Sequence, residues 1–186
     1  MAAARTAARG WLAHCHGTSM TEPAYVRLPR RLIVERLVQR SDGTPPPERK
    51  VYVFDGRAIF IRTNTPDANG QARFGDLHSC DWTRLPIAWW SPVHPDPPSR
   101  PTLLVDILSL SERLGAGLSH CRVDIYDCGD TLTVGEITLY SQSGLVVYSD
   151  PAFDFVLGSH WTIRWPMLRA FWAVAVRRWE IRPPRT

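Results

Sequence analysis

The stretch KVYVFDGRAIFIRTN, residues 50–64, decides the fold of this chain. Two arms rich in β-branched and aromatic residues flank the dipeptide Asp55-Gly56, which is the strongest short hairpin signal in the sequence. The stretch therefore predicts two antiparallel strands joined by a tight turn.

A second hairpin and a helix are predicted further along the chain. Residues 121–127 and 131–140 alternate in the manner of strands around a turn that contains glycine. Between the two hairpins, residues 102–119 carry apolar side chains at helical spacing, followed by Gly115 and Gly117 as stop signals. The order hairpin, helix, hairpin predicts an α+β fold, built on an antiparallel β-sheet with packed helices.

The remaining segments give weaker signals. Residues 31–39 are a short apolar run with one carboxylate in the middle, which suits either a strand or a helix. The segment 65–86 is predicted to be an irregular excursion, and the prolines of 41–48 and 91–101 predict loops. Residues 1–20 are only weakly patterned.

Length and composition indicate a single globular domain over residues 1–186, with 44% hydrophobic and 22% charged residues. The net charge of +4 suits anionic partners, but the arginines are spread along the chain, so no nucleic acid partner is expected. The N-terminus lacks the apolar core of a secretory signal. The most apolar late run, 167–176, is far too short to span a bilayer, so no transmembrane segment is predicted. Peripheral contact with a membrane through residues 161–179 is a weaker hypothesis.

The cysteines give no sign of a metal site. They stand at positions 15, 80, 121 and 128, without the close pairs that bind zinc. Reduced thiols in a cytoplasmic protein are the expected state, although Cys121 and Cys128 flank a predicted hairpin and could face each other.

Lys50 is the only lysine in the chain, since the other 21 of the 22 Lys and Arg residues are arginine. Chance in an arginine-rich composition explains it, or else a compact ammonium is required at this strand entrance to meet a phosphate. The second explanation fails if Lys50 Nζ lies far from the carboxylates of the second hairpin and points away from their face.

Two carboxylates, Asp124 and Glu136, stand on the two strands of that hairpin. Because side chains alternate along a strand, Arg122 shares a face with Asp124 on the first strand. On the second strand, Val134 and Thr138 share a face with Glu136. Acidic side chains on a mostly apolar hairpin are costly unless they are solvated, paired or bound to a cation. Hard carboxylate oxygens at this spacing suit Mg²⁺. A cross-strand salt bridge between Arg122 and Glu136, with Asp124 in solvent, explains the pattern equally well.

The turn of the second hairpin decides whether the carboxylates meet. A two-residue turn at Cys128-Gly129 places Asp124 and Glu136 on opposite faces, because a shift of one residue flips a strand. A three-residue loop places Arg122 opposite Glu136 and brings both carboxylates to one face. The apolar side chains of the hairpin, Ile137 among them, then point into the core.

Four motifs occur in a specific order from about Trp11 to about Gly158. They are the pattern W-L…E-x-x-Y…I-V-E, the strand R-K-V-Y-V-F-D-G, the segment HSCDWTRLP, and the hairpin RVDIYD…TVGEITLYSQSG. The residues of the first three motifs include Trp11, Glu22, Tyr25, Glu35, Glu48, Arg49, Lys50, Asp81, Trp82, Arg84 and Pro86. Together they resemble the TupA-like branch of the ATP-grasp enzymes, a branch associated with bacterial teichuronopeptide and other surface-polysaccharide synthesis.

The resemblance implies that ATP lies between two α+β subdomains. Residues 32–38 would form the hinge whose backbone reads adenine, with Glu35 and Leu37 as nucleotide-binding residues. Lys50 would be the strand cation that faces the phosphates. Arg122 would lie beside the phosphates or beside an acidic small-molecule or glycan substrate.

The resemblance also implies a Mg²⁺ site with Asp124, Glu136 and Thr138 as ligands. Many ATP-grasp enzymes carry Asn at the position of Thr138, which is a weaker oxygen donor. They carry Pro-Gly at the position of Ser143-Gly144. Both differences bear on the third metal contact.

An upstream subdomain of the family carries a phosphate-gripping segment of the form K-x-x-H-G-S-G. Residues 14–20, HCHGTSM, resemble this segment only faintly, because they lack the lysine. We therefore expect an incomplete ATP-grasp fold that corresponds to the C-terminal part of the family. Residues 1–20 are expected to be poorly ordered, and residues 159–186 to form a divergent tail.

The function implied by the resemblance is ATP- and Mg²⁺-dependent activation of a carboxylate, followed by ligation, in surface-polysaccharide synthesis. The alternative is a non-catalytic remnant or interaction module. Such a module would not bind ATP and would expose apolar surface where another subdomain docks.

Overall fold

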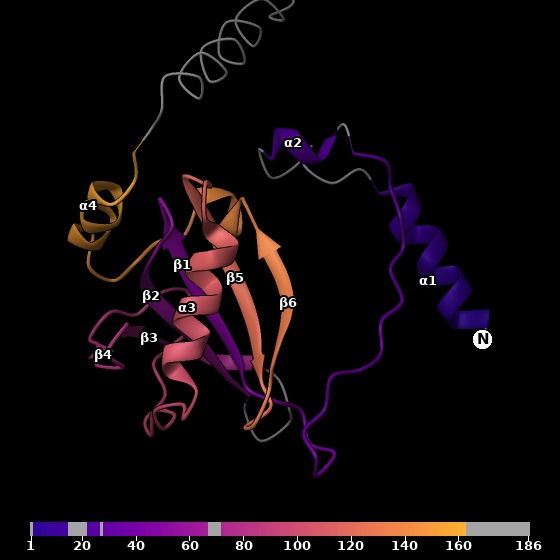
Figure 1. Ribbon diagram of the computed structural model, residues 1–186. Coiled ribbons are helices and arrows are strands. Elements are labelled where there is room, and N and C mark those ends of the chain that lie inside the picture. The colour runs from indigo at the N-terminus through magenta and orange to yellow at the C-terminus, as the bar shows by residue number, and fades with distance from the viewer. Residues whose placement is uncertain (1, 15–21, 27, 67–71, 163–186) are drawn as a thin grey trace, which may run out of the picture.

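The structure is a computed structural model that describes residues 2–14, 22–26, 28–66 and 72–162. At its centre lies a six-stranded antiparallel sheet in the order β4-β3-β2-β1-β5-β6 (Figure 1). The strands are β1 (Glu48–Phe54), β2 (Arg57–Pro66), β3 (Ala72–Ser79), β4 (Arg84–Leu85), β5 (His120–Asp127) and β6 (Leu132–Thr138). The helices are α1 (Ala2–Ala13), α2 (Pro23–Val26), α3 (Leu104–Gly115), α4 (Ala152–Ser159) and the short 3₁₀ helix η1 (Ser141–Gly144). This architecture confirms the predicted α+β fold with an antiparallel sheet.

The first predicted hairpin is confirmed in detail. Phe54 pairs with Arg57, so Asp55 and Gly56 form a two-residue turn. Both turn residues have positive φ, 47° for Asp55 and 78° for Gly56. This left-handed conformation at both positions matches the twist of the flanking strands, which explains why the Asp-Gly signal was reliable.

Helix α3 covers one face of the sheet (Figure 1). Its buried residues recur at helical spacing, so that Leu104 and Ile107 pack against the apolar residues of β1, β2 and β5. The helix ends at Gly115, where an added Cβ would lie 2.6 Å from Val53 Cγ1. Glycine therefore lets the end of the helix approach the sheet closely, as well as stopping the helix. The predicted amphipathic helix is confirmed.

The opposite face of the sheet, which we call the site face, is apolar at one end and charged at the other. At its apolar end, Tyr52 and Phe60 are buried beneath Tyr148 and Phe153, the latter on α4. The Phe153 ring meets Phe60 edge-on, with centroids 5.5 Å apart. At the other end, the side chains that face this side from β2, β1, β5 and β6 are charged.

The prediction that residues 65–86 are irregular was wrong, because this stretch contains β3 and β4. Asp76 and His78 on β3 are 0% and 1% exposed. These buried polar residues hid the alternation of the strand. Arg84 on β4 satisfies Asp76, with Nε donating to Asp76 Oδ1 over 2.9 Å. The strand thus depends on an ion pair that a hydrophobic pattern cannot reveal.

The prediction that residues 31–39 form a strand or a helix was also wrong. This segment has no regular structure, and no strand of the sheet pairs with its backbone. Ile33, Val34 and Leu37 are 80%, 96% and 76% exposed. In Figure 1 the chain from α2 to β1 runs beside β6.

The cysteines do not pair among the described residues. Cys121 is the second residue of β5 and Cys128 follows its last residue, so the length of the strand separates them by roughly 20 Å or more. Both are free thiols, as is Cys80. The alternative that Cys121 and Cys128 face each other was therefore wrong.

Some expectations fall on residues outside the described ranges. They concern most of the segment HCHGTSM, the apolar run 167–176 and most of the tail 159–186. Among the helices that are described, none is long and apolar enough to cross a membrane.

Candidate functional site

A row of four charged side chains crosses the site face. Arg62 on β2, Lys50 on β1, Asp124 on β5 and Glu136 on β6 stand directly opposite one another in the strand register. Directly opposite residues of antiparallel strands point to the same face. The row therefore places two cations on the β2 side and two carboxylates on the β6 side.

Asp124 is the centre of this charged cluster. It is 1% exposed and receives Arg122 Nε on Oδ1 at 2.6 Å, and Arg122 Nη2 on Oδ2 at 2.8 Å. Lys50 Nζ lies 2.5 Å from Asp124 Oδ2 and 2.7 Å from Glu48 Oε2. Buried carboxylates are tolerated when they are paired and hydrogen-bonded in this way.

Arg122 responds electrostatically to this environment. Burial by itself acts to lower its pKa, but the hydrogen bonds and charge of Asp124, with lesser help from Glu136, raise the pKa above the ordinary value. The guanidinium is therefore a permanent cation in the cluster. The condition set for Lys50 is also met, because its Nζ lies next to a carboxylate on the same face.

The hairpin register differs from both turns considered from the sequence. Asp127 pairs with Leu132, which leaves a four-residue loop closed by a hydrogen bond from Cys128 N to Thr131 O. The register then shifts at Gly135, so that Glu136 stands opposite Asp124 and Thr138 opposite Arg122. A β-bulge of this kind adds one unpaired residue, here Gly135, so that Glu136 points to the same face as Asp124.

Four expectations about this hairpin were wrong. Arg122 is opposite Thr138 and not opposite Glu136. Val134 pairs with Ile125 on the α3 face, so it does not share a face with Glu136. Ile137 is 42% exposed rather than buried in the core, because β6 is the edge strand. Asp124, finally, is not in solvent as the salt-bridge explanation required.

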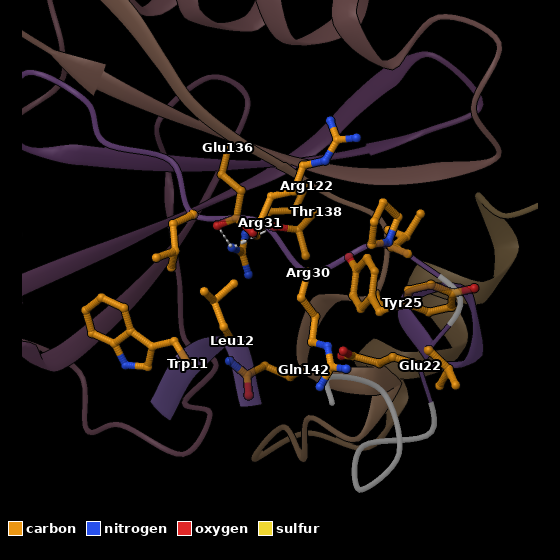
Figure 2. Close-up of a pocket in the computed structure, with 15 residues that line it drawn as sticks. Trp11, Leu12, Glu22, Tyr25, Arg30, Arg31, Arg122, Glu136, Thr138 and Gln142 are labelled. Atoms are coloured by element: carbon orange, nitrogen blue, oxygen red, sulfur yellow. Dashed lines mark hydrogen bonds and ion pairs between the residues drawn. The ribbon is translucent and has the colours of Figure 1, made fainter. Parts of the chain in front are cut away.

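The three expected magnesium ligands converge on a single nitrogen atom. Arg122 Nη2 lies 2.8 Å from Asp124 Oδ2, 3.0 Å from Thr138 Oγ1 and 3.5 Å from Glu136 Oε2. Figure 2 shows Arg122, Thr138 and Glu136 side by side. Carboxylate and hydroxyl oxygens that surround one cationic point are the donors that Mg²⁺ accepts. The donor set fits a divalent ion at the place of Arg122 Nη2, provided that the guanidinium moves aside. No group of three or more His, Cys, Asp or Glu side chains suited to a metal occurs in the described part of the chain. The expected ligand set contains only two such side chains, Asp124 and Glu136, because the third oxygen comes from Thr138.

A cavity of about 910 Å³ opens beside this cluster. Arg122, Glu136 and Thr138 form its wall on the sheet side. The opposite wall comes from α1, α2 and the segment that follows, and includes Trp11, Glu22, Tyr25, Arg30, Arg31 and Leu32 (Figure 2). The cavity is thus lined by parts of the chain that are about 90 or more residues apart.

The structure does not bring Glu35 and Leu37 to this cavity. Both are exposed and neither lines it, whereas Arg31 and Leu32 do. The expected nucleotide-binding segment therefore meets the cavity at its N-terminal end only.

Several residues of the cavity were missed as site residues. Trp11, Glu22 and Tyr25 belong to the pattern W-L…E-x-x-Y, so that motif was the signal for them. The hydroxyl of Ser143 donates to Glu22 Oε1 over 2.9 Å and ties this wall to η1. Arg62 carried no such signal, because its place beside Lys50 depends on a second bulge, between Tyr52 and Val53 in the β1–β2 pairing.

The fold and site together define an α+β protein with a buried ion cluster on one sheet face, next to a large cavity. Comparison with protein families finds a match to the family described as TupA-like ATPgrasp over residues 17–162. The chain therefore belongs to the ATP-grasp proteins, and among them to the TupA-like family. Comparisons with curated proteins and with solved structures find no match.

Proposed function

We propose that this protein binds ATP with Mg²⁺ against the site face and uses it to activate a carboxylate for ligation. The observation that supports this best is the convergence of Asp124, Glu136 and Thr138 oxygens on one cationic point, beside a cavity of about 910 Å³. Family membership supports nucleotide binding in general.

In this proposal Asp124, Glu136 and Thr138 hold the metal, while Lys50 and Arg122 neutralise phosphoryl charge. When bound, Mg²⁺ supplies Lewis-acid stabilisation of the charge that develops on the phosphate oxygens. Lys50 approaches from β1, with its ammonium already oriented by Asp124 and Glu48. Such preorganised charges lower the barrier because they need no rearrangement during the reaction.

Arg122 has a second part in the proposal. Its guanidinium takes the point on which the ligand oxygens converge, so it would have to lie further toward the cavity for these residues to hold a metal. Thr138 and Glu136 line the cavity together with Arg122, so the displaced guanidinium remains within reach of a phosphate or an acidic substrate. The segment 32–38 is proposed as the adenine hinge, with Glu35 and Leu37 approaching once the nucleotide binds.

The reaction balances as two displacements. A carboxylate oxygen of the substrate attacks the γ-phosphorus of ATP, a new P–O bond forms, and the bond to the β-phosphate oxygen breaks to release ADP. An amine or similar nucleophile then attacks the acyl carbon, and inorganic phosphate leaves as the proton of the nucleophile is lost. The substrate is an acidic small molecule or glycan, and the proposed role is in cell-surface polysaccharide synthesis in the cytoplasm.

Calorimetric titration with Mg-ATP tests the proposal, with turnover measured by ADP release. Glu136→Gln is the sharpest variant, because that side chain is 59% exposed and contributes little to folding. We expect micromolar binding by the wild-type protein and loss of turnover in Glu136→Gln and Asp124→Asn. Asp127→Asn, on the same strand but facing Arg49, serves as the matched control. Unchanged turnover in both site variants would remove the proposal.

One observation favours a second candidate, a non-catalytic interaction module. The exposed apolar side chains of Ile33, Val34 and Leu37 follow one another on a segment without regular structure. Exposed apolar patches often mark interaction sites. Absence of Mg-ATP binding in the same titration would favour the module over the enzyme.

A further inference from the structure

Arg62 is a buried cation without an anion. It is 4% exposed, and its Nε and Nη1 atoms have no hydrogen-bond partner among the described residues. Burial, above all other influences, lowers the pKa of its guanidinium, and the charge of Arg122 acts in the same direction. Tyr52 and, more weakly, Asp124 and Glu48 act to raise this pKa, but burial outweighs them. An unpaired buried charge is expensive to keep, so its retention calls for an explanation.

The carboxylates of the cluster do not supply the missing anion. In the charge row, Lys50 stands between Arg62 and Asp124, and both Asp124 oxygens are taken by Arg122 and Lys50. Glu48 is already paired with Lys50 at 2.7 Å. No ion pair to Arg62 occurs in the part of the chain that the structure describes.

A second orphaned donor lies beside Arg62. The Arg62 guanidinium carbon is 4.0 Å from the centroid of the Trp89 ring, and Trp89 Nε1 is likewise buried without a hydrogen-bond partner. The ring desolvates the cation and attracts it through its π face, but it offers no hydrogen-bond acceptor. Three nitrogen donors of two neighbouring side chains, Nε and Nη1 of Arg62 and Nε1 of Trp89, therefore lack acceptors.

The sheet beneath Trp89 is shaped to hold the indole there. A Cβ on Gly75 would fall 2.1 Å from Trp89 Nε1, so only glycine at this position of β3 lets the indole approach the strand so closely. Gly75 and Leu77 share a face, and Leu77 stands opposite Arg62, so the ring and the guanidinium lie on the site face together. Trp89 itself belongs to a segment without regular structure between β4 and α3.

We propose that Arg62 and Trp89 form the receptor for one oxyanion, a carboxylate or phosphoryl group of a ligand bound on the site face. Buried N–H donors that carry positive charge and lack acceptors match such a group in both charge and hydrogen bonding. Arg62 lies two strands from Asp124, or about 10 Å at ordinary strand spacing. The oxyanion is thus set apart from the proposed metal site. This inference extends the proposed function by adding a recognition site for an acidic group, and it rests on that function only for the identity of the ligand.

The indole N–H resonance of Trp89 provides a direct test. In ¹⁵N-labelled protein, Trp89→Phe assigns the peak by its disappearance, while the other indole peaks report that the fold persists. Inorganic phosphate and acetate are titrated separately, with ionic strength held constant by sodium chloride. We expect a saturable downfield shift of the Trp89 peak with at least one of the two anions.

Arg62→Gln removes the charge and should weaken this binding by about tenfold or more, the usual effect of losing a hydrogen bond to a charged group. Arg57→Gln is the matched control, because Arg57 is exposed on the same strand, and it should leave the shift unchanged. If Arg62→Gln does not fold, Arg62→Lys keeps the charge but loses the forked donors, and it should bind more weakly than the wild type. The inference is overturned if neither anion shifts the wild-type peak, or if the substitution of Arg62 leaves the affinity unchanged.

Titrations with Mg-ATP, alone and together with acetate, show whether the oxyanion belongs to a nucleotide or to a second substrate. They also distinguish failure of this inference from failure of the proposed function. If Mg-ATP shifts the Trp89 peak and displaces acetate, the oxyanion is a nucleotide phosphate. If acetate still binds at saturating Mg-ATP, it is the carboxylate of a second substrate. Phosphate or acetate binding without any Mg-ATP binding would preserve this inference while the proposed function fails. If Mg-ATP binds but the Trp89 peak does not shift in any titration, the proposed function stands and this inference fails.

Discussion

Asp124→Asn should be the most destabilising isosteric substitution on the site face. The carboxylate is 1% exposed and carries three contacts of 2.8 Å or less to Arg122 and Lys50. Removing one partner of a buried ion pair costs about 3–5 kcal/mol, because the other partner is left uncompensated. Lys50 keeps Glu48, and Arg122 keeps Thr138, so the lower end of this range applies, about 3 kcal/mol.

For a protein of this size, that loss corresponds to a decrease of about 6–12 °C in Tm. Urea unfolding followed by tryptophan fluorescence measures the change in the free energy of unfolding, and a thermal melt measures Tm. Asp127→Asn is the control, since Asp127 is 7% exposed on the same strand but lies 3.7 Å from Arg49 Nη2. This contact is longer than a hydrogen bond, an asparagine at this position can still accept from Gly129 N, and Arg49 keeps the Trp82 ring, whose centroid lies 5.2 Å away, so the substitution should cost only about 1 kcal/mol. Equal effects of the two substitutions would show that the Arg122–Asp124–Lys50 cluster does not stabilise the fold as argued.

Three other substitutions test separate features of the structure. Gly135→Ala places a Cβ 2.8 Å from the Tyr126 ring and should cost about 1 kcal/mol by overpacking; the urea midpoint should recover in the Tyr126→Ala background, and no recovery would argue against the contact. Burial lowers the pKa of His78 below its ordinary 6.5, against the opposing charge of Asp76, so the unfolded chain binds this proton more readily. The contribution of neutral His78 to stability is therefore complete above about pH 6.5 and falls as the pH decreases below that value. His78→Gln should reduce the difference between the urea midpoints at about pH 7.5 and about pH 5.5. An unchanged difference would contradict a lowered pKa for His78. Phe153→Ala empties the contact between α4 and the site face and should lower the free energy of unfolding by about 3 kcal/mol, whereas a change below about 1 kcal/mol would mean that α4 packs only loosely.

The sequence predicted those parts of the fold that depend on local signals. The Asp55-Gly56 turn, the two hairpins and α3 each follow from residues close together in the chain. The strand β3 was missed because its burial depends on Asp76 and its distant partner Arg84. Residues 31–39 were misassigned because an apolar run predicts burial only when another element covers it.

The candidate site was predictable in its residues but not in its geometry. Motifs pointed to Lys50, Arg122, Asp124 and Glu136, and the structure places all four in one cluster. Their register could not be derived, because each hairpin contains a bulge and counting from the turn assumes regular pairing. Arg62 illustrates the effect, since regular counting from the first turn would have placed Ile61 opposite Lys50.

The bulge at Gly135 also determines how this position tolerates insertions and deletions. Glu136 follows the bulge, so deletion of Gly135 would join Val134 to Glu136 in regular pairing, with Glu136 still opposite Asp124. A family member that lacks this residue would therefore show a gap in an alignment and yet keep its carboxylates face to face. An insertion anywhere else between the turn and Glu136 would turn that carboxylate toward α3. Counting residues from the turn is thus a poor guide to the site in related sequences, and the bulge is the feature by which to align them.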